Sequence, residues 1–175
     1  VLEERYPGRS AFSGMGLSLS QPAAMRFGAS QAWNADVIAQ PASDFVAGRD
    51  YGRLVYARTA TLLETLRRVY VDDLMRAIAR YAREQRFQHP TPDDLLAAVR
   101  REVGDEAADA LRSGLFERGW IDYEVVGVSG EKRGRVVVGR RGNVTLPVEV
   151  RLVFAEGDPR VVRWDGQGSR HEIAF

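Results

Sequence analysis

The chain has 175 residues, of which 45% are hydrophobic, and its formal net charge is +1. This composition is too apolar for a disordered chain, and the net charge is too small to attract nucleic acid or an anionic membrane surface. The absence of cysteine from the sequence excludes disulfide bonds, thiol catalysis and cysteine-ligated metal sites.

Metal and membrane signals are weak as well. The two histidines, His89 and His171, lie too far apart in sequence to form the His-x-x-x-His pair of a zinc-protease helix. We therefore expect both to have structural roles and expect no cofactor in this chain. No apolar run approaches the ~20 residues of a membrane-spanning helix, so we expect no transmembrane segment.

The first 50 residues show little periodicity. The opening VLEERYPG is typical of the last turns of a helix that stops at Pro7 and Gly8, and we interpret both chain ends as cut rather than natural. Glycine, serine and proline are scattered over residues 9–50, which predicts loop with one short helix at about Ala23–Trp33.

Helical patterns dominate the next 70 residues. The strongest covers Tyr51–Val69, with Asp50 as the expected N-cap. Its apolar face consists of Val55, Leu62, Leu66 and Val69. Further helices are expected at about Asp72–Gln85, from Thr91 to Gly104, and at about Glu106–Arg118.

The third of these helices has a specific start signal. Thr91 is the expected N-cap, Pro92 occupies the first turn, and Asp94 completes a capping box. As helix-start carboxylates, Asp93 and Asp94 are explained by capping and the helix dipole rather than by acid–base chemistry. We interpret the pair Asp72 and Asp73 in the same way.

At Trp120 the hydrophobic period changes from 3.6 to 2. The clearest strand is Val144–Phe154, an edge strand or a bulged one because Pro147 donates no hydrogen bond. We expect one apolar core beneath Leu146, Val148, Val150 and Leu152, and solvent beside Thr145, Glu149 and Arg151. Other strands are expected at about Tyr123–Val128, Arg135–Gly139, Arg160–Trp164 and the terminal HEIAF.

The sequence therefore predicts an α+β chain. A helical unit over residues 1–119 precedes a small antiparallel β-sandwich over residues 120–175, which we expect to be truncated. A basic stretch of four arginines, Arg133, Arg135, Arg140 and Arg141, lies in the sandwich. We interpret it as a solvated hairpin face rather than a nucleic-acid site.

Tyr56 has two interpretations. From its helical position alone it is most simply a core tyrosine whose hydroxyl lies at the edge of the core. The functional alternative is a phenol presented to a polar cleft, because a neutral phenol can donate a hydrogen bond to a developing oxyanion.

A resemblance favours the functional alternative. The stretch YGRLVYARTATLLETL, followed by RFQHPTPDDLLAAV and a last helix before strands, resembles the aminopeptidase N family of gluzincin zinc peptidases. Members carry a Tyr-x-Lys-Gly element, matched here by Tyr56-Ala57-Arg58-Thr59. The resemblance implies that Tyr56 supports the tetrahedral intermediate and that Tyr51 and Arg58 border the substrate cleft. Arg58 replaces the usual lysine, and Thr59 replaces the glycine.

The resemblance also implies what surrounds the chain. The helical unit would be the C-terminal part of a thermolysin-like catalytic domain, and VTLPVEVRLVF with WDG would belong to the β-sandwich that follows it. The parent would bind zinc through a His-Glu-x-x-His helix and a glutamate upstream of Val1, and would remove N-terminal residues from peptides. Without that zinc-binding half, its partner in the same protein, this chain would be inactive.

One alternative of another class stays open. Arginine and threonine in place of lysine and glycine favour a non-catalytic homologue, a scaffold that keeps the fold and binds a partner protein. Intact zinc ligands upstream of Val1 would indicate the enzyme. Substitution of those ligands by residues that cannot bind zinc would indicate the scaffold.

Overall fold

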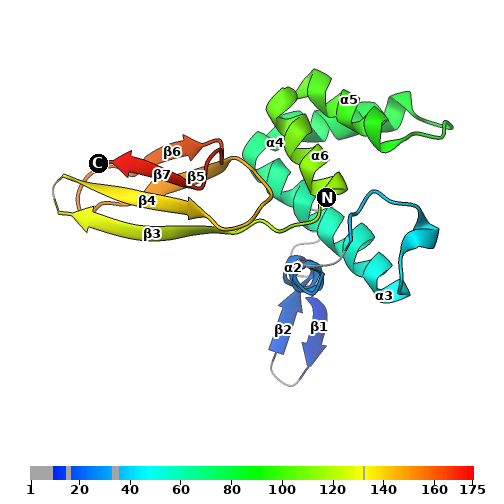
Figure 1. Cartoon of the computed structure of the whole chain (residues 1–175), viewed down its shortest axis with the longest axis horizontal. Coiled ribbons are helices and arrows are strands. Elements are labelled where there is room, and N and C mark those ends of the chain that lie inside the picture. The colour runs from blue at the N-terminus through cyan, green and yellow to red at the C-terminus, as the bar shows by residue number, and fades with distance from the viewer. Residues whose placement is uncertain (1–9, 15–16, 33–35, 132) are drawn as a thin grey trace.

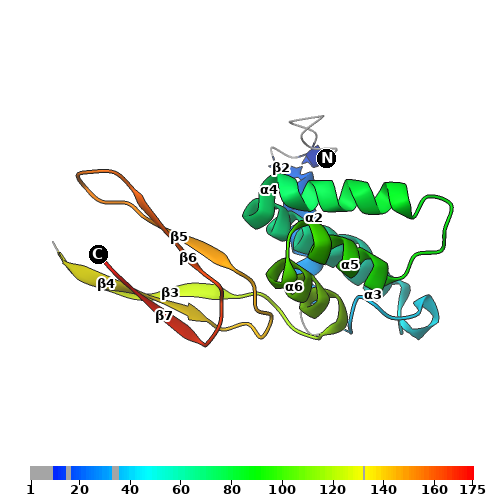
Figure 2. The same cartoon turned by 90° about the horizontal axis from the view of Figure 1, so that it is seen from above.

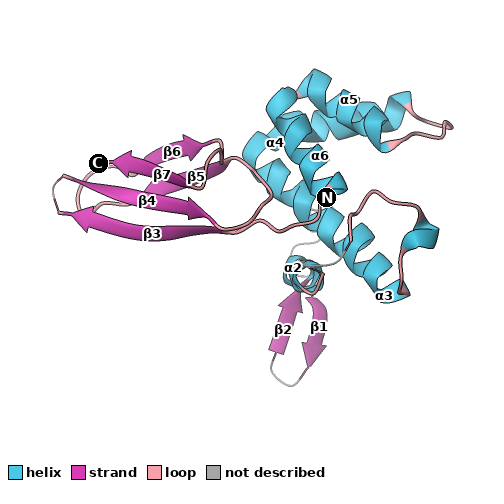
Figure 3. Ribbon diagram, in the orientation of Figure 1, coloured by secondary structure: helices cyan, strands magenta, loops and turns pink. Residues whose placement is uncertain are grey.

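The computed structural model describes residues 10–14, 17–32, 36–131 and 133–175. Its architecture is α+β, as the sequence predicts, with the helices gathered at one end and the larger antiparallel sheets at the other (Figure 1). Colouring by secondary structure shows the same separation, with the small hairpin β1–β2 standing apart beside α2 (Figure 3). In the described part of the chain, no helix combines the length and apolarity needed to span a bilayer.

The N-terminal segment is more ordered than the sequence predicts. Strands β1 (Ser10–Gly14) and β2 (Leu17–Ser20) pair antiparallel, so the expectation of loop is wrong over these residues. Helix α2 (Gln21–Ser30) follows at once, because the Ser20 hydroxyl accepts a hydrogen bond from the Ala23 N–H at 3.4 Å. The short helix thus begins and ends earlier than expected. Trp33 and VLEERYPG lie outside the described residues.

The two helices expected over Tyr51–Val69 and Asp72–Gln85 are present, joined end to end at a kink. After the short 3-10 helix η1 (Ala42–Asp44), helix α3 (Gly48–Tyr51) continues into the π-helix η2 (Gly52–Arg58) and then α4 (Thr59–Glu84). A kink at Val71, with φ 41° and ψ −115°, lies where the two sequence patterns meet. The prediction that Asp50 is the N-cap is wrong: Ala47 holds that position.

Helices α5 (Pro92–Glu102) and α6 (Asp105–Phe116) pack against α4. The predicted capping box is confirmed, since the Asp94 carboxylate accepts the Thr91 backbone N–H at 2.7 Å. The apolar faces of α4, α5 and α6 enclose the helical core. Its largest fully buried side chains are Leu54, Leu66, Leu74, Val99, Leu111, Val144 and Leu146.

The sheets form two layers. Strands β3 (Tyr123–Gly130), β4 (Gly134–Arg140) and β7 (Arg170–Ala174) make one antiparallel sheet in the order β3-β4-β7. Strands β5 (Val148–Leu152) and β6 (Arg160–Trp164) make the other, which lies across the first (Figure 2). A second core joins the layers through Val136, Val138, Leu152, Trp164 and Ile173.

The strand expected over Val144–Phe154 is shorter at both ends, since β5 covers Val148–Leu152, and Thr145 is half-buried rather than exposed. Glu149 and Arg151 are exposed as predicted, but the ladder begins only at Val148, directly after Pro147. Val144 and Leu146 belong to the helical core, whereas Val148, Val150 and Leu152 pack in the sheet core. The expectation of one shared core is therefore wrong, because the chain crosses from the helices to the sheets within this segment.

Candidate functional site

Tyr51 and Tyr56 lie side by side. Their rings meet edge to face with centroids 5.9 Å apart, and the Phe45 ring also meets that of Tyr51 edge to face at 5.2 Å. Residues five apart on an α-helix point about 140° away from each other. The π-helix η2 adds a residue to the turn and so brings both tyrosines to one face.

Thr59 holds this wide turn. Its backbone N–H is directed at the carbonyl of Leu54, five residues back, and its hydroxyl donates to the same oxygen at 3.3 Å. The threonine that replaces the glycine of the resembled element is thus bonded within the turn. Because π-turns are costly and are frequent at functional sites, η2 marks this surface as a candidate site.

The Tyr56 side chain faces outward, with 63% of its surface exposed. The described part of the chain supplies no hydrogen-bond partner for its hydroxyl. The interpretation of Tyr56 as a buried core tyrosine is therefore wrong. An exposed phenol beside a second tyrosine can donate a hydrogen bond to whatever molecule covers this surface.

Arg58 lies on the other side of η2. Its Nη2 donates to the carbonyls of Gly119 at 2.7 Å and Glu117 at 3.4 Å, just beyond the end of α6. Burial lowers the pKa of this guanidinium, and Nη1 is buried without a hydrogen-bond partner among the described residues. The structure thus brings Tyr51 and Tyr56 together but places Arg58 apart from them.

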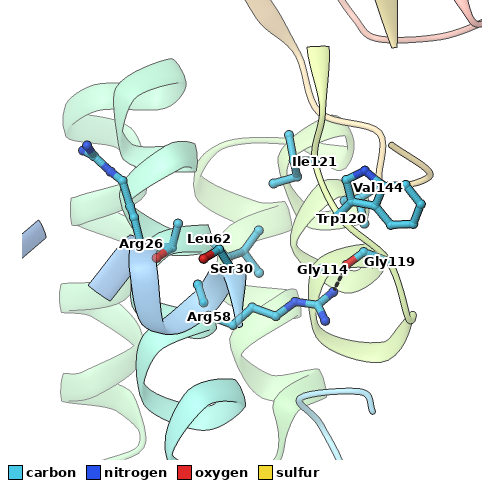
Figure 4. Close-up of a pocket in the computed structure, with 11 residues that line it drawn as sticks. Arg26, Ser30, Arg58, Leu62, Gly114, Gly119, Trp120, Ile121 and Val144 are labelled. Carbon is cyan, nitrogen blue, oxygen red and sulfur yellow. Dashed lines mark hydrogen bonds between the residues drawn. The ribbon is translucent and has the colours of Figure 1, made fainter. Parts of the chain in front are cut away.

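A cavity of about 550 Å³ lies beside Arg58, where the helices meet the segment that leads into β3. Its walls come from α2, α4, α6 and the segment between α6 and β3, and Figure 4 shows the Arg58 side chain extending toward Gly119. Leu62 and Val144 supply apolar surface, and Arg26 lies on the α2 side.

The histidines are far from both places. His89 is exposed in the loop between α4 and α5, and the ring of His171 on β7 stacks on Trp164 at 5.5 Å. Over the described ranges, no group of three or more histidine, aspartate and glutamate side chains could hold a metal ion. The resemblance assigns the zinc ligands to residues outside this chain.

Comparisons with protein-family models, curated proteins and solved structures yield no match. Sequence reasoning found the tyrosine pair but missed the cavity, whose lining residues are dispersed between Arg26 and Val144. The one local signal was Gly114 inside a helix, a residue that costs ~1 kcal/mol relative to alanine unless close packing requires it.

Proposed function

We propose that this chain is part of a zinc aminopeptidase in which Tyr56 donates a hydrogen bond to the oxyanion of the tetrahedral intermediate. The observation that carries the proposal is an exposed Tyr56 without a partner for its hydroxyl among the described residues, on a π-turn that sets it beside Tyr51. A phenol hydroxyl suits this role because it can donate a hydrogen bond to a developing oxyanion.

The rest of the chemistry belongs to residues outside this chain. A zinc ion held there would polarise the scissile carbonyl and activate water, and the substrate would be a peptide with a free N-terminus. The isolated chain would then be inactive. Its own contribution would be one oriented donor, and losing such a donor typically costs ~2.7–4 kcal/mol of transition-state stabilisation.

Tyr51 would act on Tyr56 rather than on the substrate. Its ring makes edge-to-face contacts with the rings of Phe45 and Tyr56, at 5.2 and 5.9 Å. Such contacts stabilise one ring orientation by ~0.5–1.5 kcal/mol beyond the area they bury. The Tyr56 hydroxyl would therefore be oriented before substrate arrives.

The test is Tyr56→Phe in the longer protein that contains the zinc ligands. We expect kcat on an aminoacyl amide to fall by about 100-fold or more, because only the oxyanion donor is lost. Zinc content and melting temperature should stay unchanged. Tyr81→Phe, which removes a phenol hydroxyl from α4 rather than from η2, is the matched control and should leave kcat unchanged.

Near-normal turnover of the Tyr56→Phe protein would refute the catalytic role and leave the resemblance as a statement about fold alone. If the longer protein with Tyr56 intact binds no zinc and cleaves no aminoacyl amide, the scaffold alternative replaces the enzyme. These two results are distinguishable because the second does not involve the variant.

A further inference from the structure

The cavity beside Arg58 is separate from the tyrosine surface. Arg58 and Tyr56 are two positions apart on η2, which directs their side chains to nearly opposite sides of the helix. At about 550 Å³ the cavity falls within the 300–1,000 Å³ typical of small-molecule sites. An occupant of this cavity would therefore not touch Tyr56.

The charge of the cavity wall has one sign. Arg26 and Arg58 line it, and none of the described lining residues is acidic. Much of the remaining wall is apolar, with Leu62, Ile121 and Val144 among its members. A wall of this kind complements a ligand that has an apolar body and an anionic group.

Arg58 gives a second, independent indication. Its Nη1 is buried and bonded to no described residue, although the neighbouring Nη2 is fixed to Gly119 at 2.7 Å. A buried guanidinium N–H without an acceptor is costly, and such a group in a native structure calls for a partner. Burial also lowers the pKa of Arg58, a shift that a nearby anion would offset.

We propose that this cavity binds a small amphipathic carboxylate. The apolar body lies against Leu62, Ile121 and Val144, and the carboxylate lies between the guanidinium groups of Arg26 and Arg58. Figure 4 shows Arg26 extending from α2 away from Arg58, so this exposed side chain must turn for its guanidinium to reach the carboxylate. Two sources share this chemistry, a medium-chain fatty acid and the C-terminal carboxylate of a short apolar peptide. The site is independent of the proposed peptidase function.

Isothermal titration of the 175-residue chain with sodium decanoate tests the proposal. We expect saturable binding with a Kd on the order of 10–100 µM, and octanoate should bind roughly tenfold more weakly because two methylene groups are lost. Decanol, which has the same chain without the charge, should also bind at least tenfold more weakly. N-acetyl-Leu-Phe and its C-terminal amide form the peptide arm of the experiment.

Three variants test whether the ligand binds in this cavity. Arg26→Gln should weaken decanoate binding about threefold to fivefold while leaving decanol unaffected, since only an exposed charge is removed. Arg83→Gln, at an exposed arginine of α4 outside the cavity wall, is the matched control and should change neither affinity. Ser30→Phe fills the cavity from the exposed end of α2 and should weaken every ligand at least tenfold without lowering the melting temperature.

Each outcome is decisive. Tighter binding of decanoate than of N-acetyl-Leu-Phe supports the fatty-acid source. Tighter binding of N-acetyl-Leu-Phe than of both decanoate and its own amide supports the peptide source. Equal affinity for decanoate and decanol overturns the anionic character of the site. Absence of saturable binding by either carboxylate at 1 mM (roughly tenfold above the weakest expected Kd), or binding that Ser30→Phe leaves intact, overturns the site itself.

Discussion

The Arg58 side chain has a structural role of its own. A lysine has a compact charge on a flexible stem, whereas the planar guanidinium carries several N–H groups in fixed directions. Here Nη2 reaches the carbonyls of both Glu117 and Gly119 after α6. The arginine therefore links the π-helix to the chain segment that leaves the helical unit.

Truncation of this side chain tests the link. Arg58→Ala should lower the free energy of unfolding by about 1–3 kcal/mol, because a charge-assisted hydrogen bond to a carbonyl is lost. Arg58→Lys should recover only part of that loss, since one ammonium group cannot reproduce the planar fork. Urea unfolding followed by circular dichroism measures both. Arg83→Ala is the control and should change the free energy of unfolding by less than about 0.5 kcal/mol. If Arg83→Ala and Arg58→Ala destabilise the chain equally, the hydrogen bonds of Arg58 do not stabilise it specifically.

At the scale of elements, local sequence accounts for α5. Thr91, Pro92 and Asp94 stand at the spacing of a capping box, and the Asp94 carboxylate accepts both the Thr91 N–H at 2.7 Å and its hydroxyl at 2.8 Å. The backbone hydrogen bond first, and the hydroxyl second, hold the pKa of Asp94 below its ordinary value. The helix start therefore depends on an ionised carboxylate.

This dependence gives a pH prediction. A carboxyl whose folded-state pKa is depressed contributes stability above its unfolded pKa of about 4, and the contribution is lost as pH falls through the lower folded value. The difference in unfolding free energy between the native chain and Asp94→Asn should be constant from about pH 5 to pH 7 and shrink below about pH 4. Urea titrations across this range measure it, and a pH-independent difference would contradict the assignment.

The hairpin β1–β2 and the π-helix η2 could not be predicted from local sequence, for different physical reasons. The hairpin β1–β2 lies in glycine- and serine-rich sequence, and its strands have only five and four residues, so the alternation within Leu17–Ser20 is too short a pattern to predict it. The π-helix η2 has the same residue types as an α-helix. Its extra residue becomes evident only in the carbonyl of Leu54 bonding to Thr59 and in the contact of the two tyrosines.

For the whole molecule, the junction between helices and sheets is held by Asn143. Its Oδ1 accepts the Trp120 N–H at 3.0 Å, and its Nδ2 donates to the Arg118 carbonyl at 2.7 Å. Gly119 lies between those two residues, and a Cβ atom there would overlap the Asn143 amide. A second contact, Glu106 to Arg163 at 2.7 Å, joins α6 to β6 but is about half exposed and so stabilises little.

Gly119→Ala should therefore loosen the junction. We expect the free energy of unfolding to fall by about 2–3 kcal/mol, because the added methyl group must displace Asn143 and break both of its bonds. Gly127→Ala, at an exposed strand position where an added Cβ meets nothing within 4 Å, is the matched control and should be nearly neutral. Thermal unfolding measures both variants, and equal melting temperatures would show that Asn143 does not hold the junction.

The sequence by itself determined the α+β class, the capping box of α5, the break near Val71 and the alternation over β5, because each depends on neighbours a few residues away. A resemblance singled out Tyr51 and Tyr56 as candidate site residues, whereas the contact between their rings is a result of the fold. Tertiary structure alone decided that Val144 and Leu146 serve the helical core, that Arg58 meets Gly119, and that a cavity lies beside them. The physical reason is that periodicity specifies which face of an element is apolar but not which other element covers it.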